Sequence, residues 1–297
     1  MDRRNFLQKG TMAVLAGCGM SAIPANAFAA ATAKKGNRIG IQLYSIRESL
    51  PKDFQGSVKK LADIGYHYAE AYGWDGKSFM GKSLKETAAI LADVGMQLSG
   101  THCGTGLLPT DINNKEWDYW RTSAQEMHAA GGRHLVQSWL PVEKTLDNLK
   151  RLAAQFNKIG EICKQGGVKF GYHNHHAEFQ QIEGNAILDV LIQNTNPALV
   201  FFQMDLGHTV NGGGDVLGYM RKYPKRFLSW HASDFKRGGD YTEVGSGDVP
   251  WMELFNIAKS YGLEDLTVEQ ETGADIYASC KTDFDYLAQF AWTKVKR

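Results

Sequence analysis

Short hydrophobic runs, rich in β-branched and aromatic residues, alternate with longer stretches of helical periodicity from Arg38 to the end of the chain. A short apolar run bounded by turn residues is typical of a strand that is buried on both faces, as in a parallel sheet. The pattern predicts eight strands, at residues 39–44, 66–71, 97–102, 134–139, 169–175, 200–205, 227–232 and 266–270.

Between these runs, apolar residues recur at the spacing of an amphipathic helix. The pattern predicts eight helices, at residues 54–64, 84–94, 117–129, 146–165, 186–193, 216–222, 251–260 and 284–294. Several of them end at a glycine suited to the left-handed position that terminates a helix, such as Gly65, Gly95 and Gly262. Eight βα units in about 260 residues predict the α/β class and a single (β/α)8 TIM barrel over residues 38–297. A dinucleotide-binding sheet is disfavoured, because no G-x-G-x-x-G follows the first strand.

The first 29 residues have a different character. Arg3 and Arg4 precede a weakly hydrophobic stretch rich in glycine and alanine, and residues 25–29 offer the small side chains that a signal peptidase needs. We therefore expect a twin-arginine signal peptide at residues 1–29, a short linker at residues 30–37 and export of the mature protein to the periplasm. Residues 15–18 also resemble a lipobox, so a lipid anchor on Cys18 is the less favoured alternative. No other segment approaches the roughly 20 apolar residues of a membrane span.

Charge and cysteine content exclude several classes of protein. With 33 Lys and Arg against 32 Asp and Glu, the net charge of +1 creates no long-range field that would attract nucleic acid. The four cysteines form no C-x-x-C pair, so neither a disulfide framework nor a structural zinc site is indicated. The composition is that of a globular protein and is compatible with a homo-oligomer.

Polar and metal-capable side chains gather where the predicted strands end, which is the catalytic end of this kind of barrel. In strand order they are Glu70, His102, Gln137 near Trp139, His173 to His176, Asp205 with His208, His231 with Asp234, and Glu269 with Glu271. A single histidine at a strand end is usually a hydrogen-bonded wall residue. So many histidines and carboxylates at the same end of one barrel instead indicate a shared metal site.

Imidazole and carboxylate donors together suit a divalent transition metal better than calcium, which prefers oxygen ligands alone. We expect one divalent metal as cofactor: Mn, Co, Zn or Mg. Hydroxyl and carbonyl oxygens of a sugar can chelate such an ion, which stabilises the charge formed when a base removes the proton next to the carbonyl. The expected partner is therefore a small carbohydrate, against whose ring Tyr44 and Trp139 could stack.

The strand-end segments resemble the xylose-isomerase-like barrel superfamily of sugar phosphate isomerases and epimerases, which also includes endonuclease-IV-type enzymes. The resemblance lies in residues 39–44, 171–175, 204–208, 230–234, 245–247 and 268–270. Members of this superfamily typically hold one metal through Glu, Asp, His and Glu on strands five to eight. The resemblance implies Asp205, His231 and Glu269 as ligands, with His173 at the strand-five position, where many members have glutamate.

The site residues that these considerations imply fall into two further groups. The catalytic group is Glu269, His173, His102 and His175. The substrate-binding group is Glu70, Gln137, His208, Asp234, Tyr44 and Trp139.

The strand-five histidine bears on the reaction, because in the superfamily the carboxylates of strands five and eight act on opposite faces of the substrate carbon. We expect an isomerase or epimerase of an unphosphorylated sugar, since the last two strand loops carry no basic or glycine-rich phosphate cradle. A lyase or hydratase of a keto-sugar or keto-glycoside, with His102, His175 or Glu178 as its acid, is the alternative. A second class of function is a non-catalytic barrel that binds a sugar. DNA repair is disfavoured, because the near-neutral chain offers no basic groove.

Overall fold

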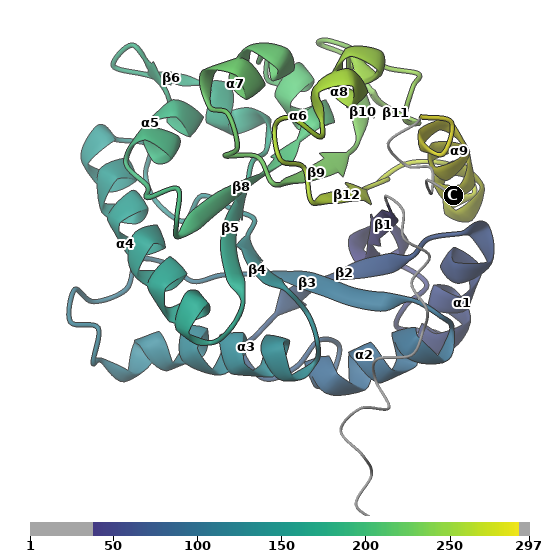
Figure 1. The fold of residues 1–297 in the computed structure, drawn as a ribbon, viewed down its shortest axis with the longest axis horizontal. Helices are drawn as coiled ribbons and strands as arrows, with labels where there is room; N and C mark the ends of the chain where they lie inside the picture. The colour runs from purple at the N-terminus through teal and green to yellow at the C-terminus, as the bar shows by residue number, and fades with distance from the viewer. Residues whose placement is uncertain (1–37, 291–297) are drawn as a thin grey trace, which may run out of the picture. The chain divides into compact units, whose positions relative to one another are not determined.

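Eight parallel strands close into a barrel in the computed structural model, which describes residues 38–290 (Figure 1). Going round the ring, the strand order is β1-β12-β9-β8-β5-β4-β3-β2. The strands are β1 (Ile39–Gln42), β2 (Tyr68–Trp74), β3 (Gln97–Cys103), β4 (His134–Gln137), β5 (Lys169–His173), β8 (Val200–Asp205), β9 (Ser229–Ala232) and β12 (Asp265–Val268). Each overlaps one of the eight predicted strands, and the predicted (β/α)8 barrel is confirmed.

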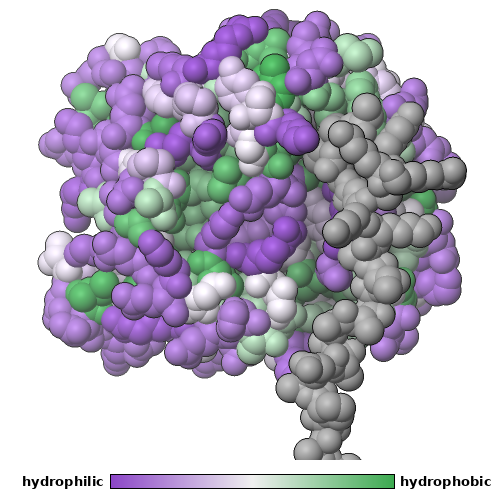
Figure 2. Space-filling view, in the orientation of Figure 1, coloured by the Kyte–Doolittle hydropathy of each residue, from purple (hydrophilic) through white to green (hydrophobic). Residues whose placement is uncertain are grey.

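Helices lie outside the strands (Figure 1). They are α1 (Phe54–Ile64), α2 (Leu84–Asp93), α3 (Asp118–Ala129), α4 (Leu146–Gln165), α5 (Ile187–Gln193), α6 (Leu206–Asn211), α7 (Val216–Lys222), α8 (Trp251–Ile257) and α9 (Ile276–Leu287), with 3-10 turns η2 (Leu43–Ile46), η3 (Lys115–Trp117) and η4 (His176–Phe179). Side chains of Asp53, Ser83 and Thr145 cap the first turns of α1, α2 and α4 by accepting backbone N–H groups. The helices bury their apolar sides, and hydrophilic residues cover much of the face in Figure 2.

Several short elements were not predicted. The strand-end loops contain two hairpins, β6 (Gln181–Ile182) with β7 (Asn185–Ala186), and β10 (Asp234–Phe235) with β11 (Tyr241–Thr242). The predicted helix at residues 284–294 was wrong in its start, because α9 begins at Ile276. The reason is a cap: the Asp275 side chain accepts the backbone N–H groups of Tyr277 and Ala278.

The predicted signal peptide (1–29), the linker (30–37) and Cys18 lie outside the described residues and stay predictions. None of the helices within residues 38–290 has both the length and the apolar character needed to cross a membrane. Cys103, Cys163 and Cys280 lie buried with free thiols, and burial raises the pKa of each thiol. These three cysteines lie on β3, α4 and α9.

Glycines on alternate strands make room for large side chains in the layer of the barrel interior nearest the strand starts. Each glycine is in register with the large residue on the next strand, and a Cβ added to it would lie 1.9 to 2.5 Å from that residue's ring. The pairs are Gly40 with Tyr68, Gly100 with His134, and Gly171 with Phe201. Side chains of alternate strands share a layer in such barrels. The close packing of these three pairs therefore fills the amino-terminal end of the barrel.

Gly100→Ala tests this packing. The new Cβ would lie 2.2 Å from His134 Cδ2 and 2.6 Å from the His134 carbonyl oxygen, so the backbone must shift. We expect the free energy of unfolding to fall by about 1–3 kcal/mol, as is typical of overpacked interiors, measured by urea denaturation. Gly106→Ala, where an added Cβ has no neighbour within 4 Å, is the matched control. Equal stability of the two variants would contradict the interpretation.

Candidate metal centre and active site

Four side chains from successive strands of the ring meet at the carboxyl end of the barrel. His173 ends β5, Asp205 ends β8, His231 lies in β9, and Glu269 follows β12. One donor atom of each residue lies within 4.8 Å of the others, and all four residues are buried. These are the four residues assigned as ligands from the sequence, and the fold brings all of them together.

Strand register explains why they meet. Asp205 is paired with His231 across β8 and β9, and His231 is paired with Thr267 of β12. Glu269 stands two residues beyond Thr267 and therefore shares its face, one layer nearer the mouth. His173 is in register with Gln203, two residues before Asp205. The four ligand candidates therefore occupy three successive levels of the same interior, with His173 lowest, Asp205 and His231 next, and Glu269 nearest the mouth.

Asp205 offers the clearest sign of a missing partner. Its Oδ1 accepts hydrogen bonds from the His208 backbone N–H at 2.7 Å and from Ser233 Oγ at 2.5 Å. Its Oδ2 is buried and has no hydrogen-bond partner, and burial raises the pKa of this carboxyl. A buried carboxylate oxygen without a donor is unfavourable unless a cation meets it. The donor set therefore fits a divalent ion.

His231 lies between two carboxylates. Its Nδ1 is 2.7 Å from Glu269 Oε2, and its Nε2 is 2.7 Å from Glu70 Oε2. Burial alone would lower the pKa of His231, but the contacts with Glu269 and Glu70 raise it to about 10. Burial would likewise raise the pKa of Glu269, yet the contact with His231 lowers it. A carboxylate behind a ligating imidazole is a common arrangement in metal sites.

His173 has the opposite electrostatic character. Burial, reinforced by His231 and His102, lowers the pKa of its ring well below the usual range. A neutral imidazole is the form that binds a metal. His102, His173 and His231 also form a second cluster with donor atoms within 4.8 Å, in which His102 stacks on His231 at a ring-centroid distance of 5.1 Å.

The remaining predicted catalytic groups lie around this cluster. His175 is half-buried, and burial, together with His208, lowers its pKa to about 4. The His208 ring lies 4.9 Å from that of His175 between centroids, and its buried Nδ1 has no hydrogen-bond partner. Glu178, predicted as a possible acid, instead accepts the Tyr172 hydroxyl at 2.5 Å and the His175 backbone N–H at 3.1 Å. It holds the His175 segment in place.

Two residues predicted to bind substrate have other surroundings. Glu70 is fully buried among side chains of five strands, so its carboxylate has no surface to offer to a substrate. Asp234 is also fully buried, where it accepts four hydrogen bonds from its own loop. The donors are the backbone N–H groups of Phe235, Gly245 and Val249 and the indole N–H of Trp251. Asp234 follows β9 as predicted, whereas the predicted strand-end position of Glu70 was wrong, because β2 continues to Trp74 and Glu70 lies inside it. The fold uses the carboxylates of both residues internally.

The predicted aromatic residues are better placed for a ligand. Tyr44 and Trp139 are 36% and 43% exposed, unlike most large aromatic residues of the described chain. Tyr44 packs edge-on against Tyr72, with Arg47 above its other side. Gln137 is buried, with its Nε2 donating to the Trp139 carbonyl and its Oε1 unpartnered. These groups remain candidates for sugar contacts.

Sequence reasoning missed the polar residues inside the barrel, namely Gln42, His134 and Gln203. Gln203 Oε1 accepts from His102 Nε2 at 2.7 Å and from His173 Nδ1 at 3.1 Å. The signal was present, because Gln203 is a polar residue within the apolar strand β8. A polar side chain in a strand buried on both faces needs buried partners.

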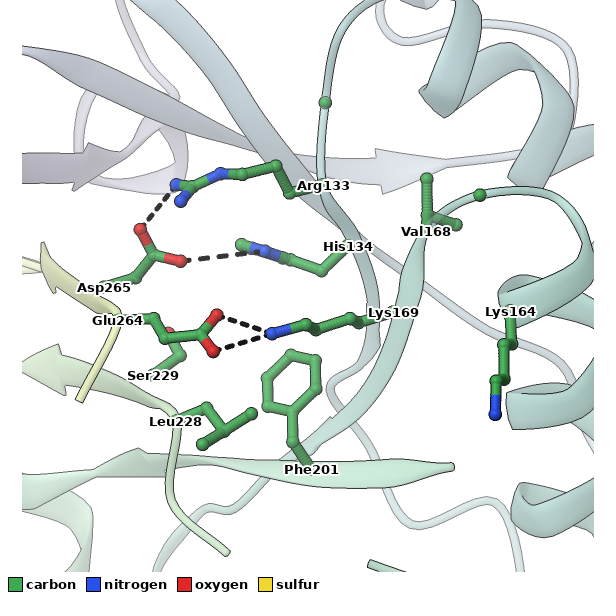
Figure 3. Close-up of a pocket in the computed structure, with 12 residues that line it drawn as sticks. Arg133, His134, Lys164, Val168, Lys169, Phe201, Leu228, Ser229, Glu264 and Asp265 are labelled. Carbon is green, nitrogen blue, oxygen red and sulfur yellow. Dashed lines mark hydrogen bonds and ion pairs between the residues drawn. The ribbon is translucent and has the colours of Figure 1, made fainter. Parts of the chain in front are cut away.

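A pocket of about 430 Å³ lies at the opposite end, where β4, β5, β9 and β12 begin (Figure 3). Two ion pairs line it: Arg133 with Asp265 at 2.5 Å, and Lys169 with Glu264 at 2.6 Å. His134 Nδ1 lies 3.9 Å from Asp265. The amino-terminal end of such barrels serves stability rather than chemistry, and these pairs close it.

The fold and the site together define a class: (β/α)8 barrels with a mixed histidine and carboxylate centre at the carboxyl ends of their strands. Comparison with known families agrees with this class. The chain belongs to the xylose isomerase-like TIM barrel family, whose model matches residues 58–294.

Individual relatives include two kinds of enzyme. The chain is 30% identical to an inosose dehydratase of Clostridium tetani over 43% of its own length, which is about half (48%) of that relative. It is 24% identical to an inosose dehydratase of Geobacillus kaustophilus over 67% of its own length and 73% of that relative. A solved sugar phosphate isomerase/epimerase of Parabacteroides distasonis superposes with a TM-score of 0.78 at 25% identity, covering 89% of this chain and 99% of that one. The comparisons support an enzyme of the isomerase or the lyase class.

Asp234→Asn tests the internal role of Asp234. Whichever way the new amide lies, its NH2 group would face N–H donors of the loop, so we expect the free energy of unfolding to fall by roughly 2–3 kcal/mol. Urea denaturation measures this loss. Asp248→Asn is the matched control, because Asp248 is an exposed carboxylate of the same loop and accepts one backbone N–H, from Arg237. A stability loss no greater than that of the control would contradict the structural role.

Proposed function

We propose that the protein is a divalent-metal-dependent enzyme that removes the proton next to the carbonyl of an unphosphorylated keto-sugar or keto-glycoside. The observation that carries the proposal is the convergence of His173, Asp205, His231 and Glu269, with Asp205 Oδ2 buried and unpartnered. A divalent ion held there, Mn, Co, Zn or Mg, would polarise the carbonyl and stabilise the negative charge that develops.

Glu269 is the base in this proposal. It is 8% exposed, whereas Asp205 is 1% exposed, so of the two carboxylates Glu269 is the one that a substrate at the mouth would meet. The Asp205 Oδ1 atom is also occupied by His208 N–H and Ser233. Proton transfer by such a positioned side chain typically contributes about 10²–10⁴-fold to a rate.

We infer that the reaction is a β-elimination. Glu269 takes the proton next to the carbonyl, the electron pair of that C–H bond forms a carbon–carbon double bond, and the bond to the β-oxygen breaks. The leaving oxygen takes a proton from a histidine at the mouth, His208, because the lowered pKa of His175 leaves that ring neutral. With His173 in place of a second carboxylate, the site holds one carboxylate base and several imidazoles, which suits this sequence of steps. The similarity to inosose dehydratases supports it.

An isomerase or epimerase is the second candidate. It is favoured by the likeness to the Parabacteroides distasonis isomerase/epimerase, which extends over 99% of that chain. Such a reaction would return the proton to carbon, with a histidine acting in place of the second carboxylate.

The types of side chain around the ligand candidates support a substrate without a phosphate group. The described neighbours of the four ligand candidates are histidines, carboxylates, amides and hydroxyls rather than lysine or arginine. Exposed Tyr44 and Trp139 add aromatic surface suited to a sugar ring.

Metal content provides the first test. We expect purified protein to bind about one divalent ion, and Asp205→Ala and Glu269→Ala to weaken that binding by more than about 100-fold, since each removes a direct ligand. Titration calorimetry with MnCl2 and ZnCl2 measures the affinity. Glu264→Gln, which changes a carboxylate at the other end of the barrel, is the control. Unchanged affinity in both ligand variants would refute the centre.

Product analysis separates the reactions. Keto-sugars and keto-glycosides incubated in heavy water with each metal are followed by NMR. Elimination gives new unsaturated products, whereas epimerisation gives deuterium at an inverted carbon. We expect elimination, slowed about 10²–10⁴-fold by Glu269→Gln. Inverted, deuterated sugar would favour the epimerase. Binding without exchange would refute catalysis and leave a sugar-binding barrel.

A further inference from the structure

Glu70 is an anion at the centre of the barrel and is surrounded by donors. Side chains of five strands reach its two oxygens: Gln42 at 3.1 Å, His134 at 3.0 Å, Gln203 at 3.1 Å, His231 at 2.7 Å and His102 at 3.3 Å. The amide N–H groups of Gln42 and Gln203 donate to Oε2, and that of Gln203 donates also to Oε1, so both oxygens of Glu70 act as acceptors.

The acceptor oxygens of Glu70 determine which nitrogen of the His231 ring faces away from the four-residue cluster. Because Glu70 Oε2 can only accept, His231 Nε2 must carry the hydrogen of their 2.7 Å contact. The other ring nitrogen, Nδ1, lies 2.7 Å from Glu269 Oε2 and shares a hydrogen with it, so an ion bound at the four-residue cluster would take the place of the hydrogen on Nδ1. The carboxylate thereby selects which nitrogen of His231 is presented to the cluster.

Gln203 does the same for His173. Its Nε2 donates to both Glu70 oxygens and to Ser229 Oγ, so the amide has one orientation, with Oε1 as the acceptor. Oε1 lies 3.1 Å from His173 Nδ1, which must therefore be the donor. His173 Nε2 is left as the lone-pair nitrogen.

We propose that Glu70 and Gln203 are positioning residues of the metal centre, which set the ring nitrogens that His231 and His173 present to the ion. This inference rests on the proposed function. Neither residue is exposed, so each acts through a histidine rather than on the substrate.

Packing alone does not explain these residues. Burying a carboxylate is unfavourable, and apolar side chains of similar volume often replace buried charged groups without loss of stability. A barrel of this kind usually fills its interior with branched apolar residues. The carboxylate and the amide are explained by the histidines that they orient.

Glu70→Gln is the central experiment. The variant keeps the shape of the side chain but replaces one acceptor oxygen by an NH2 group. We expect the affinity for Zn²⁺ and Co²⁺, measured by titration calorimetry, to fall 10–100-fold, the usual effect of losing such a partner, and the visible absorption of bound Co²⁺ to change. Gln203→Met, which removes the acceptor of His173, is expected to act in the same direction. Glu264→Gln should leave both readouts unchanged.

The outcomes distinguish this inference from the proposed function. If the unmodified protein binds neither ion, the proposed function fails. If the unmodified protein binds Zn²⁺ and Glu70→Gln binds it equally well with an unchanged Co²⁺ spectrum, only the positioning role is overturned.

A measurement on the unmodified protein covers the case in which Glu70→Gln does not fold. In the Zn²⁺-loaded protein labelled with ¹⁵N-histidine, we expect His231 to carry its hydrogen on Nε2 and to bind zinc through Nδ1. The His231→Gln spectrum identifies the signal. A hydrogen on Nδ1, with zinc on Nε2, would overturn the inference.

Discussion

Closure of eight parallel strands into a ring determines where every interior side chain of this protein can lie. Neighbouring strands are held in register, and side chains alternate between the interior and the helices outside. The interior is consequently built in levels. At the strand starts, glycines accommodate Tyr68, His134 and Phe201. Above them lie Glu70 and Gln203, with His173 in register with Gln203, and the other ligand candidates lie nearer the mouth.

These levels make the proposed chemistry depend on residues that never meet a substrate. The contact between His134 and Glu70 joins the lowest level to the middle one, and the contact between Glu70 and His231 joins the middle level to the mouth. Gly100, which packs beside His134, is therefore connected to the site by two hydrogen bonds. In this molecule, hydrogen bonds link the residues that pack the amino-terminal end of the barrel to the residues of the proposed active site.

Much of this arrangement could be predicted from the sequence. Buried parallel strands give short apolar runs that are easy to locate, and polar residues near their ends mark the mouth. The resemblance to the superfamily then implied His173, Asp205, His231 and Glu269 as the ligand set, and the fold brings these four together. The roles of Glu70 and Asp234 could not be predicted in this way. Asp234 follows a strand as ligand-binding residues do, and nothing in the sequence indicated that β2 continues beyond Glu70 to Trp74. Only the three-dimensional contacts show that the oxygens of both residues are occupied by the fold. The hairpins, whose strands have only two residues, and the helix cap at Asp275 are too short to produce a recognisable hydrophobic pattern in the sequence.

The three buried cysteines have a consequence for the conditions in which this fold can exist. Reaction with oxidants and with other disulfides requires the thiolate, and burial disfavours that form at Cys103, Cys163 and Cys280. Burial also keeps all three thiols away from reagents in solution. The folded barrel therefore protects these thiols, whether glutathione keeps the surroundings reducing or a disulfide-forming system keeps them oxidising.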